Sequence, residues 1–323
     1  MIPRWLLKAL AQGVISHLPR QDWINIQFQK RVTKSIIPSQ KALARRLKWC
    51  AEHLVYYRRN AESDSLPETV LELGTGWFPT VPIGMYLCGV RKVYSIDIRR
   101  LSDPAYFDAM LRILSEYPHE ELKAILPDLQ DERFAALKQI ANTAKSQHEA
   151  LEQMQIELLI ADARHTDFPD ASVDYVISNT TLEHIPYPIL VELFQEFHRI
   201  LKPDGLMSHI IDMSDHYQHF DHSITGYNFL RYNDFVWSLL NNPLQYQNRL
   251  REPDYRNLHA TTGFRIVEQE NRSGSVDELK HIKLAKRFDA YSQDEILVKS
   301  ARMISTPMEK TTVTSTTVRD THV

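Results

Sequence analysis

Residues 70–80, with the sequence VLELGTGWFPT, constrain the fold more than any other part of the chain. Residues 70–73 form a short apolar run that stops at a glycine, which predicts a buried parallel strand. Gly74 and Gly76 carry no Cβ, so a tight turn through them lets the backbone come close to a ligand. A helix opening within residues 79–87 would direct its free N–H groups at the same place. Strand, turn and helix together predict a nucleotide or nucleoside pocket.

The residues around this turn distinguish two cofactor classes. A dinucleotide-binding turn has a third glycine three residues after the second, whereas here Gly76 is followed by Trp-Phe-Pro. Glu72, inside the strand, would be unfavourable beside a pyrophosphate and instead suits a ligand with a cationic end. The turn therefore favours a positively charged cofactor over a dinucleotide.

The segment Glu72-Leu73-Gly74-Thr75-Gly76 resembles the first motif of the class I S-adenosylmethionine-dependent methyltransferases, whose cofactor carries a sulfonium and an ammonium group. Phe78 stands where that family usually has a third glycine. Residues 161–186 and the Lys-Pro-Asp-Gly segment at 202–205 resemble the same family. In that family an acid after the third strand contacts the adenine amino group, a role that the resemblance gives to Asp162. It implies S-adenosylmethionine as the cofactor.

Asp97 lies 21 residues after Gly76, close to the spacing at which an acid meets a ribose hydroxyl pair. Asn179 ends the fourth predicted strand, at the edge where open α/β sheets place their ligands. The full set of expected cofactor-binding residues is Glu72, Gly74, Thr75, Gly76, Asp97, Asp162, Ala163 and Asn179.

Six further strands are expected along the chain. They are predicted at residues 93–98, 157–161, 173–178, 206–212, 263–269 and 295–303. With the resemblance, they predict a seven-stranded, mostly parallel Rossmann-like sheet with helices on both faces. The expected divisions are a helical N-terminal cap at 1–66, a methyltransferase domain at 67–303 with a helical insertion at 101–155 and an acceptor-side cap at 213–262, and a disordered tail at 304–323.

Composition excludes several alternatives. The two cysteines, Cys50 and Cys88, have no CxxC or Cys/His spacing, which argues against structural zinc and a disulfide framework and favours a reduced, cytoplasmic setting. The sequence has neither an apolar run long enough to span a membrane nor an extended basic groove for nucleic acid.

Charge is unevenly distributed. Residues 1–60 hold twelve Lys and Arg against Asp22 and Glu52, so this segment carries +10 while the remainder carries −13. Within residues 1–20, apolar residues recur at helical spacing beside basic ones: Leu7, Leu10, Val14 and Leu18. Such a helix can cover the mouth of an active site, which we favour, or lie on an anionic membrane.

Three acids and three histidines lie within residues 212–222, directly after the fifth predicted strand. They allow a His–Asp general base, a polar loop or a metal site, and we rank them in that order. The expected catalytic residues are His216 as the base, Asp215 as its carboxylate partner, and His184 near the cofactor pocket; no metal ligand is assigned.

The sequence thus predicts a methyltransferase acting on a hydroxyl of a small molecule, sugar or glycolipid precursor, of the kind found in secondary metabolism. An N-methyltransferase, an NAD-dependent enzyme and a non-catalytic binding module remain alternatives. The aromatic stretch 227–246, with Arg231, Arg249 and Arg251, could be an acceptor-binding cap or simply core.

Overall fold

The computed structural model describes residues 3–19, 24, 37–61 and 65–308. Its centre is a seven-stranded sheet in the order β3-β2-β1-β4-β5-β7-β6. The strands are β1 (Thr69–Leu73), β2 (Lys92–Asp97), β3 (Ile156–Ile160), β4 (Val173–Asn179), β5 (Leu201–Asp212), β6 (Phe264–Ser273) and β7 (Val298–Pro307). The first five pair in parallel, whereas β7 runs antiparallel to both β5 and β6. The predicted fold is confirmed.

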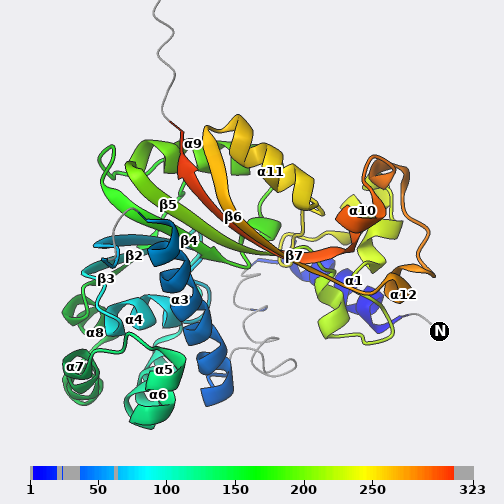
Figure 1. Ribbon diagram of the computed structural model, residues 1–323. Helices are drawn as coiled ribbons and strands as arrows, with labels where there is room; N and C mark the ends of the chain where they lie inside the picture. The colour runs from blue at the N-terminus through cyan, green and yellow to red at the C-terminus, as the bar shows by residue number, and fades with distance from the viewer. Residues whose placement is uncertain (1–2, 20–23, 25–36, 62–64, 309–323) are drawn as a thin grey trace, which may run out of the picture.

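Helices cover both faces of this sheet (Figure 1). One face carries α3 (Gln40–Asn60), α4 (Thr80–Leu87), α5 (Pro104–Ser115), α6 (His119–Ile125), α7 (Asp131–Thr143) and α8 (Gln147–Gln153). The other carries α9 (Tyr187–Ile200) and α11 (Glu252–Thr261). Each face has its own cluster of buried apolar side chains. The sheet is therefore covered on both sides, as a mostly parallel sheet must be.

A third, smaller core lies beside the sheet. It joins α1 (Arg4–Ile15), α10 (Asp234–Leu240), α12 (Val276–Leu279) and α13 (Gln293–Leu297), together with the short 3₁₀ turns η3 (His216–His219), η4 (Asn228–Arg231) and η5 (Lys286–Phe288). Figure 1 shows α1, α10 and α12 gathered to the right of the sheet. We call this group the side lobe.

The N-terminal segment and the insertion both contribute helices to one face of the sheet. Helix α3 packs against α4 and β5 and is therefore part of the helical layer on that face. Within 101–155, the helices break at Pro118 and Pro127 as expected, and they bury Phe107, Met110 and Leu137 in the core of that face. The insertion is therefore part of the main hydrophobic core.

Several predicted boundaries are wrong. The strand predicted at 206–212 starts earlier, because residues 201–205 also belong to β5, and the register with β4 shifts opposite them. Residues 295–297 belong to α13, and β7 runs on to Pro307 because Phe264 and its neighbours in β6 pair with it. Residues 304–307 are consequently strand and not tail, while 309–323 lie outside the described residues.

Candidate functional site

Gly74 and Gly76 form the turn at the carboxyl end of β1, and both have a positive φ, 89° and 63°. A Cβ on Gly74 would lie 2.4 Å from Thr181 Oγ1, so a larger residue would displace the segment that follows β4. In contrast, no atom of the described residues lies within 4 Å of the Cβ position of Gly76. Gly74 is thus needed for packing, and Gly76 leaves room for close approach to a ligand.

Glu72 is buried beneath this turn and is 4% exposed. Ser95 Oγ donates to Glu72 Oε2 (2.7 Å), and Thr75 Oγ1 lies 2.6 Å from Ser95 Oγ. Burial raises the pKa of Glu72 to about 8, although Ser95 and Arg46 act in the opposite direction. A cationic ligand placed beside it would favour the ionised carboxylate. Glu72 therefore fits a cofactor with a positive end.

Asp97 lies at the end of β2, directly beside the glycine turn. The backbone N–H of Gly76 donates to Asp97 Oδ2 and that of Arg99 to Oδ1, both at 3.0 Å. Each carboxylate oxygen still has a second lone pair, so Asp97 can also accept from a pair of hydroxyls. Asp97 therefore retains the acceptor capacity that its predicted contact with the ribose hydroxyls requires.

A cavity of about 700 Å³ lies beside the same turn. Thr75, Gly76 and Arg99 line it on the side of the sheet. Its outer wall comes from α5 and α8, through residues such as Phe107 and Leu151. This volume is within the range of small-molecule sites. The helices of the insertion therefore help to enclose the space next to the predicted cofactor turn.

Asp162 follows β3, and Arg164 holds its carboxylate. Arg164 Nε lies 3.0 Å from both oxygens and Nη2 lies 2.6 Å from Oδ2, while Nη1 pairs with Glu192. This ion pair lowers the pKa of Asp162. Ala163 beside it is buried. An adenine contact of Asp162 would have to share the carboxylate with Arg164, and it stays a prediction.

Asn179 ends β4 and is fixed by a histidine that the sequence reasoning missed. His53 on α3 bonds Asn179 Oδ1 through Nε2 (3.1 Å) and Ser208 through Nδ1 (2.7 Å). Burial lowers the pKa of His53 to about 3, so its ring is neutral. Asn179 Nδ2 is buried without a hydrogen-bond partner in the described structure. This amide is available to a ligand, as its predicted cofactor role requires.

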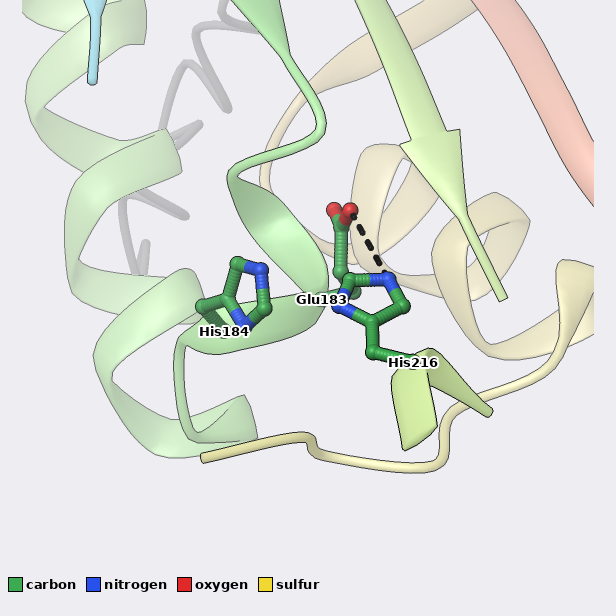
Figure 2. A group of neighbouring side chains, drawn as sticks. All are labelled: Glu183, His184 and His216. Carbon is green, nitrogen blue, oxygen red and sulfur yellow. Dashed lines mark ion pairs between the residues drawn. The ribbon is translucent and has the colours of Figure 1, made fainter. Parts of the chain in front are cut away.

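Three ionisable side chains converge just beyond the ends of β4 and β5 (Figure 2). Glu183 and His184 come from η2 (Leu182–His184) after β4, and His216 begins η3 after β5. One ligand atom from each lies within 4.8 Å of the others. We call these three residues the edge cluster. The sheet therefore brings His184 and His216 together, as expected of two residues at neighbouring parallel strand ends.

The edge cluster contains polar atoms that its neighbours do not satisfy. Glu183 is 3% exposed, and within the described chain neither carboxyl oxygen nor His216 Nε2 has a hydrogen-bond partner. His216 Nε2 lies 4.0 Å from Glu183 Oε1, which is too long for a hydrogen bond. Burial raises the pKa of Glu183 well above its usual range. Unsatisfied buried polar atoms are costly, so this arrangement indicates a place for a ligand.

The ring of His184 is held in one orientation. Its Nδ1 lies 2.6 Å from the backbone carbonyl oxygen of Tyr246, so Nδ1 carries the proton and Nε2 a lone pair. Burial, and then the proximity of His216, lower the pKa of His184 to about 4. His184 is therefore neutral near pH 7 and can act as an acceptor or a ligand.

The carboxylate nearest to His216 is Asp212, not the predicted Asp215. Asp212 Oδ2 lies 3.5 Å from His216 Nε2, while Ser214 donates to Oδ1. Burial alone would raise the pKa of Asp212, but the contacts with His216 and Ser214 lower it to about 2. Asp212 is thus ionised and lies close enough to stabilise a positive charge on the imidazole.

Asp215 is a structural residue in this fold. It is fully buried, caps η3 by accepting from the backbone N–H of Tyr217 (2.8 Å), and accepts from Asn228 Nδ2 (3.1 Å). Its oxygens are therefore committed to the loop backbone and to Asn228, which corrects its predicted pairing with His216.

Three other charged residues of this region, Asp221, Arg249 and Arg251, also have structural roles. Asp221 accepts from the backbone N–H of Trp5 at the start of α1 (3.0 Å), and His222 is exposed. The buried Arg251 donates to the carbonyl oxygens of Met213, Ile296 and Val298. Arg249 is likewise buried and paired with Asp234. Neither of these two arginines presents a charge to an acceptor.

The edge cluster can also be read as a metal site, because two histidines and one carboxylate are a ligand set that divalent transition metals bind. Within the described residues no other group of three such side chains is this close. The cluster therefore fits either an acceptor group or a divalent ion.

The comparisons with known proteins agree with this fold. The family model described as "Methyltransferase domain" matches residues 124–208, a segment that begins within α6 and ends in β5. The chain thus contains a segment that matches a methyltransferase domain. Together with the motifs at Glu72–Gly76 and 161–186, this match indicates a methyltransferase that uses S-adenosylmethionine and is similar to the class I enzymes.

Several solved structures are similar to this chain but distant from it in sequence. The Burkholderia thailandensis 1,6-didemethyltoxoflavin-N1-methyltransferase, solved with its substrate and S-adenosylhomocysteine, is 13% identical; the alignment covers 96% of this chain and 92% of that one, with a TM-score of 0.44. The YcgJ protein from Bacillus subtilis is 13% identical over 80% and 99%, with a TM-score of 0.43. The PH0226 protein from Pyrococcus horikoshii is 14% identical over 87% and 98%, with a TM-score of 0.43. No curated protein sequence gives a significant match.

Proposed function

We propose that this methyltransferase transfers the methyl group of S-adenosylmethionine to a hydroxyl of a small molecule, sugar or glycolipid precursor. The observation that carries this proposal is the edge cluster, in which a buried carboxyl group and two histidines converge with unsatisfied polar atoms. An alcohol must lose its proton as it attacks the sulfonium methyl, and a base at this point would take that proton. An amine nitrogen with a lone pair would not need one.

His216 is the residue we assign as the base. The neighbouring carboxylate of Asp212, at 3.5 Å, would stabilise the imidazolium that forms when His216 accepts the proton. Glu183, whose pKa is raised by burial, would hydrogen-bond to the acceptor. Since the sulfonium is already activated, the remaining task of the protein is to align donor and acceptor.

On the cofactor side, we assign Glu72 to the cationic end, Asp97 to the ribose hydroxyls, Asp162 with Ala163 to the adenine, and Asn179 to the end nearest the acceptor. Support comes from the position of Asp97 beside Gly76 and from the unpartnered amide nitrogen of Asn179. Gly76, with open space where a Cβ would stand, would let the cofactor approach the backbone.

The setting we propose is the cytoplasm. Cys50 and Cys88 are both buried and free, which suits a reducing compartment. No helix among the described residues is long and apolar enough to cross a membrane.

The test is an acceptor screen that compares matched alcohols and amines. We expect formation of S-adenosylhomocysteine with hydroxylated acceptors and little with the corresponding amines. A mass increase of one methyl group on oxygen, located by fragmentation, would support the proposal. Methylation confined to nitrogen would establish the N-methyltransferase alternative instead.

A further inference from the structure

Helix α1 packs on the rest of the side lobe through the face that carries Trp5 and Ala9. The opposite face carries an apolar stripe formed by Leu7, Leu10 and Val14. Trp5 and Ala9 are buried, and Trp5 packs against Tyr217 and Tyr232 with ring centroids 5.7 and 5.8 Å apart. Asp221 accepts from the backbone N–H of Trp5 and so fixes the start of the helix. The orientation of α1 is thus set by specific contacts with the segment that follows η3.

This attachment leaves the apolar stripe in solvent. Leu7, Leu10 and Val14 are 53%, 51% and 65% exposed, and Leu18 just beyond the helix is 43% exposed. At 3.6 residues per turn they form one continuous stripe along the outer side of α1. The sequence analysis favours a helix that covers an active-site mouth. In the structure, the most apolar side of α1 faces away from the protein instead. The apolar side of this helix is therefore available for contact with a partner outside the fold.

The neighbouring helix α10 also carries exposed apolar side chains. It packs against α1, and its Phe235 and Leu239, one turn apart, are 73% and 68% exposed. Large exposed side chains on two adjacent helices exceed the scattered apolar residues normal for a protein surface. They indicate an interaction surface.

The charge on helix α1 is positive. Residues 3–19 contain Arg4 and Lys8 and no acidic residue. Arg4 is exposed at the start of the helix, whereas Lys8 is half-buried with its Nζ over the rings of Tyr217 and Phe220. Lys283 and Lys286, which follow α12 in the same lobe, are also exposed, and Lys280 pairs with Asp277. Apolar side chains flanked by basic ones match the interfacial region of an anionic bilayer, where the apolar groups enter and the cations meet the headgroups.

We propose that the outer face of α1, with Phe235 and Leu239 of α10, binds the surface of an anionic lipid membrane. The side lobe that would rest on the membrane also carries η3 and therefore His216. If the proposed function holds, this arrangement would bring the acceptor site close to a lipid-linked hydroxyl compound. Membrane binding itself does not depend on methyl transfer.

Vesicle flotation of the full chain tests the proposal without an activity readout. We expect flotation with vesicles of phosphatidylcholine mixed with phosphatidylglycerol, less with phosphatidylcholine alone, and a loss of binding as salt screens the charges. Leu10→Glu and Val14→Glu should each lower the partition coefficient roughly tenfold or more, because a charged side chain replaces a buried apolar one. Val55→Glu on α3, a site 45% exposed, is the matched control and should float like wild type.

Arg4→Glu separates charge from apolar contact, and it should weaken binding to anionic vesicles while leaving binding to neutral ones unchanged. Equal flotation of wild type, Leu10→Glu and Val14→Glu would overturn the proposal. The proposal would also be overturned if the chain never floats. In that case, self-association in sedimentation velocity that Val14→Glu abolishes would assign the surface to a second copy of the chain.

Discussion

At the residue scale, Glu72 is the clearest titrating group of the cofactor turn. Its folded pKa of about 8 exceeds the ordinary value of 4.5. The folded protein therefore binds more protons than the unfolded chain between these two pH values, and stability falls as pH rises through that window. Below pH 4.5 both states are protonated and this contribution is fully present.

We expect Glu72→Gln to flatten the decline of stability between about pH 5 and pH 8, as measured by urea unfolding at several pH values. Ser95 still has an acceptor in this variant, so the fold is retained. Cofactor binding should also release protons from wild type near pH 7, since the cationic ligand favours the carboxylate. Calorimetry in buffers of different ionisation enthalpy would measure this release, and none in wild type would contradict the assignment of Glu72.

His216 and His222 provide a matched pair on one loop. His216→Ala should lower turnover by about 10²–10⁴-fold while cofactor affinity is retained, the usual range for loss of a general base. His222, which is exposed, should tolerate the same change. His184→Ala should have a milder effect than His216→Ala. Full activity in His216→Ala would leave alignment alone as the mechanism.

A chelator distinguishes the base from a metal in the same cluster. A general base at His216 predicts that turnover survives treatment with a chelator. If turnover is lost, restored by a divalent ion, and lost also in Glu183→Gln and His184→Ala, the edge cluster holds a metal and His216 is a ligand.

The role of a residue could be predicted from the sequence where the course of the backbone alone determines its position. Gly76 and Asp97 meet because a glycine turn and the next strand end lie side by side in any such sheet. The partner of His216 could not be predicted in this way, because Asp212, Asp215 and Asp221 lie in one irregular loop. Asp215 was assigned by adjacency, whereas Asp212, the last residue of β5, is the residue whose carboxylate lies nearest to His216.

At the element scale, the loop after β5 depends on its caps. Asp215→Ala would leave the backbone N–H of Tyr217 and the amide of Asn228 without their acceptor, at a cost of about 1–3 kcal/mol of folding stability for each buried group. Asp215→Asn retains one acceptor oxygen and should cost less. Denaturant unfolding measures both, and an Ala variant as stable as wild type would contradict the structural role.

The strands and helices could be predicted where buried residues recur at a regular spacing. The residues at which they end could not be predicted in this way. The runs near Val70, Val93 and Val173 each lie within a strand of the sheet. The end of β7 was missed because its last residues are ordered by pairing with β6, a partner distant in sequence. The direction of α1 was missed because its apolar stripe, which would ordinarily face the core, faces outward here.

At the scale of the whole molecule, the seven-stranded sheet places two regions at one edge: the glycine turn with Asp97, and the edge cluster with His216. Asn179, at the end of β4, lies between the elements that carry them in the strand order. We propose cofactor binding for the first region and acceptor activation for the second, so variants in the two should have separable effects.

The most direct test is titration calorimetry with S-adenosylhomocysteine on wild type, Asp97→Ala and His216→Ala. We expect one site in wild type, affinity lowered roughly ten- to a hundredfold in Asp97→Ala because a charge-assisted hydrogen bond is lost, and unchanged affinity in His216→Ala. Absence of binding to wild type, or equal affinity in wild type and Asp97→Ala, would contradict the assignment of the cofactor pocket to the turn at Gly74 and Gly76.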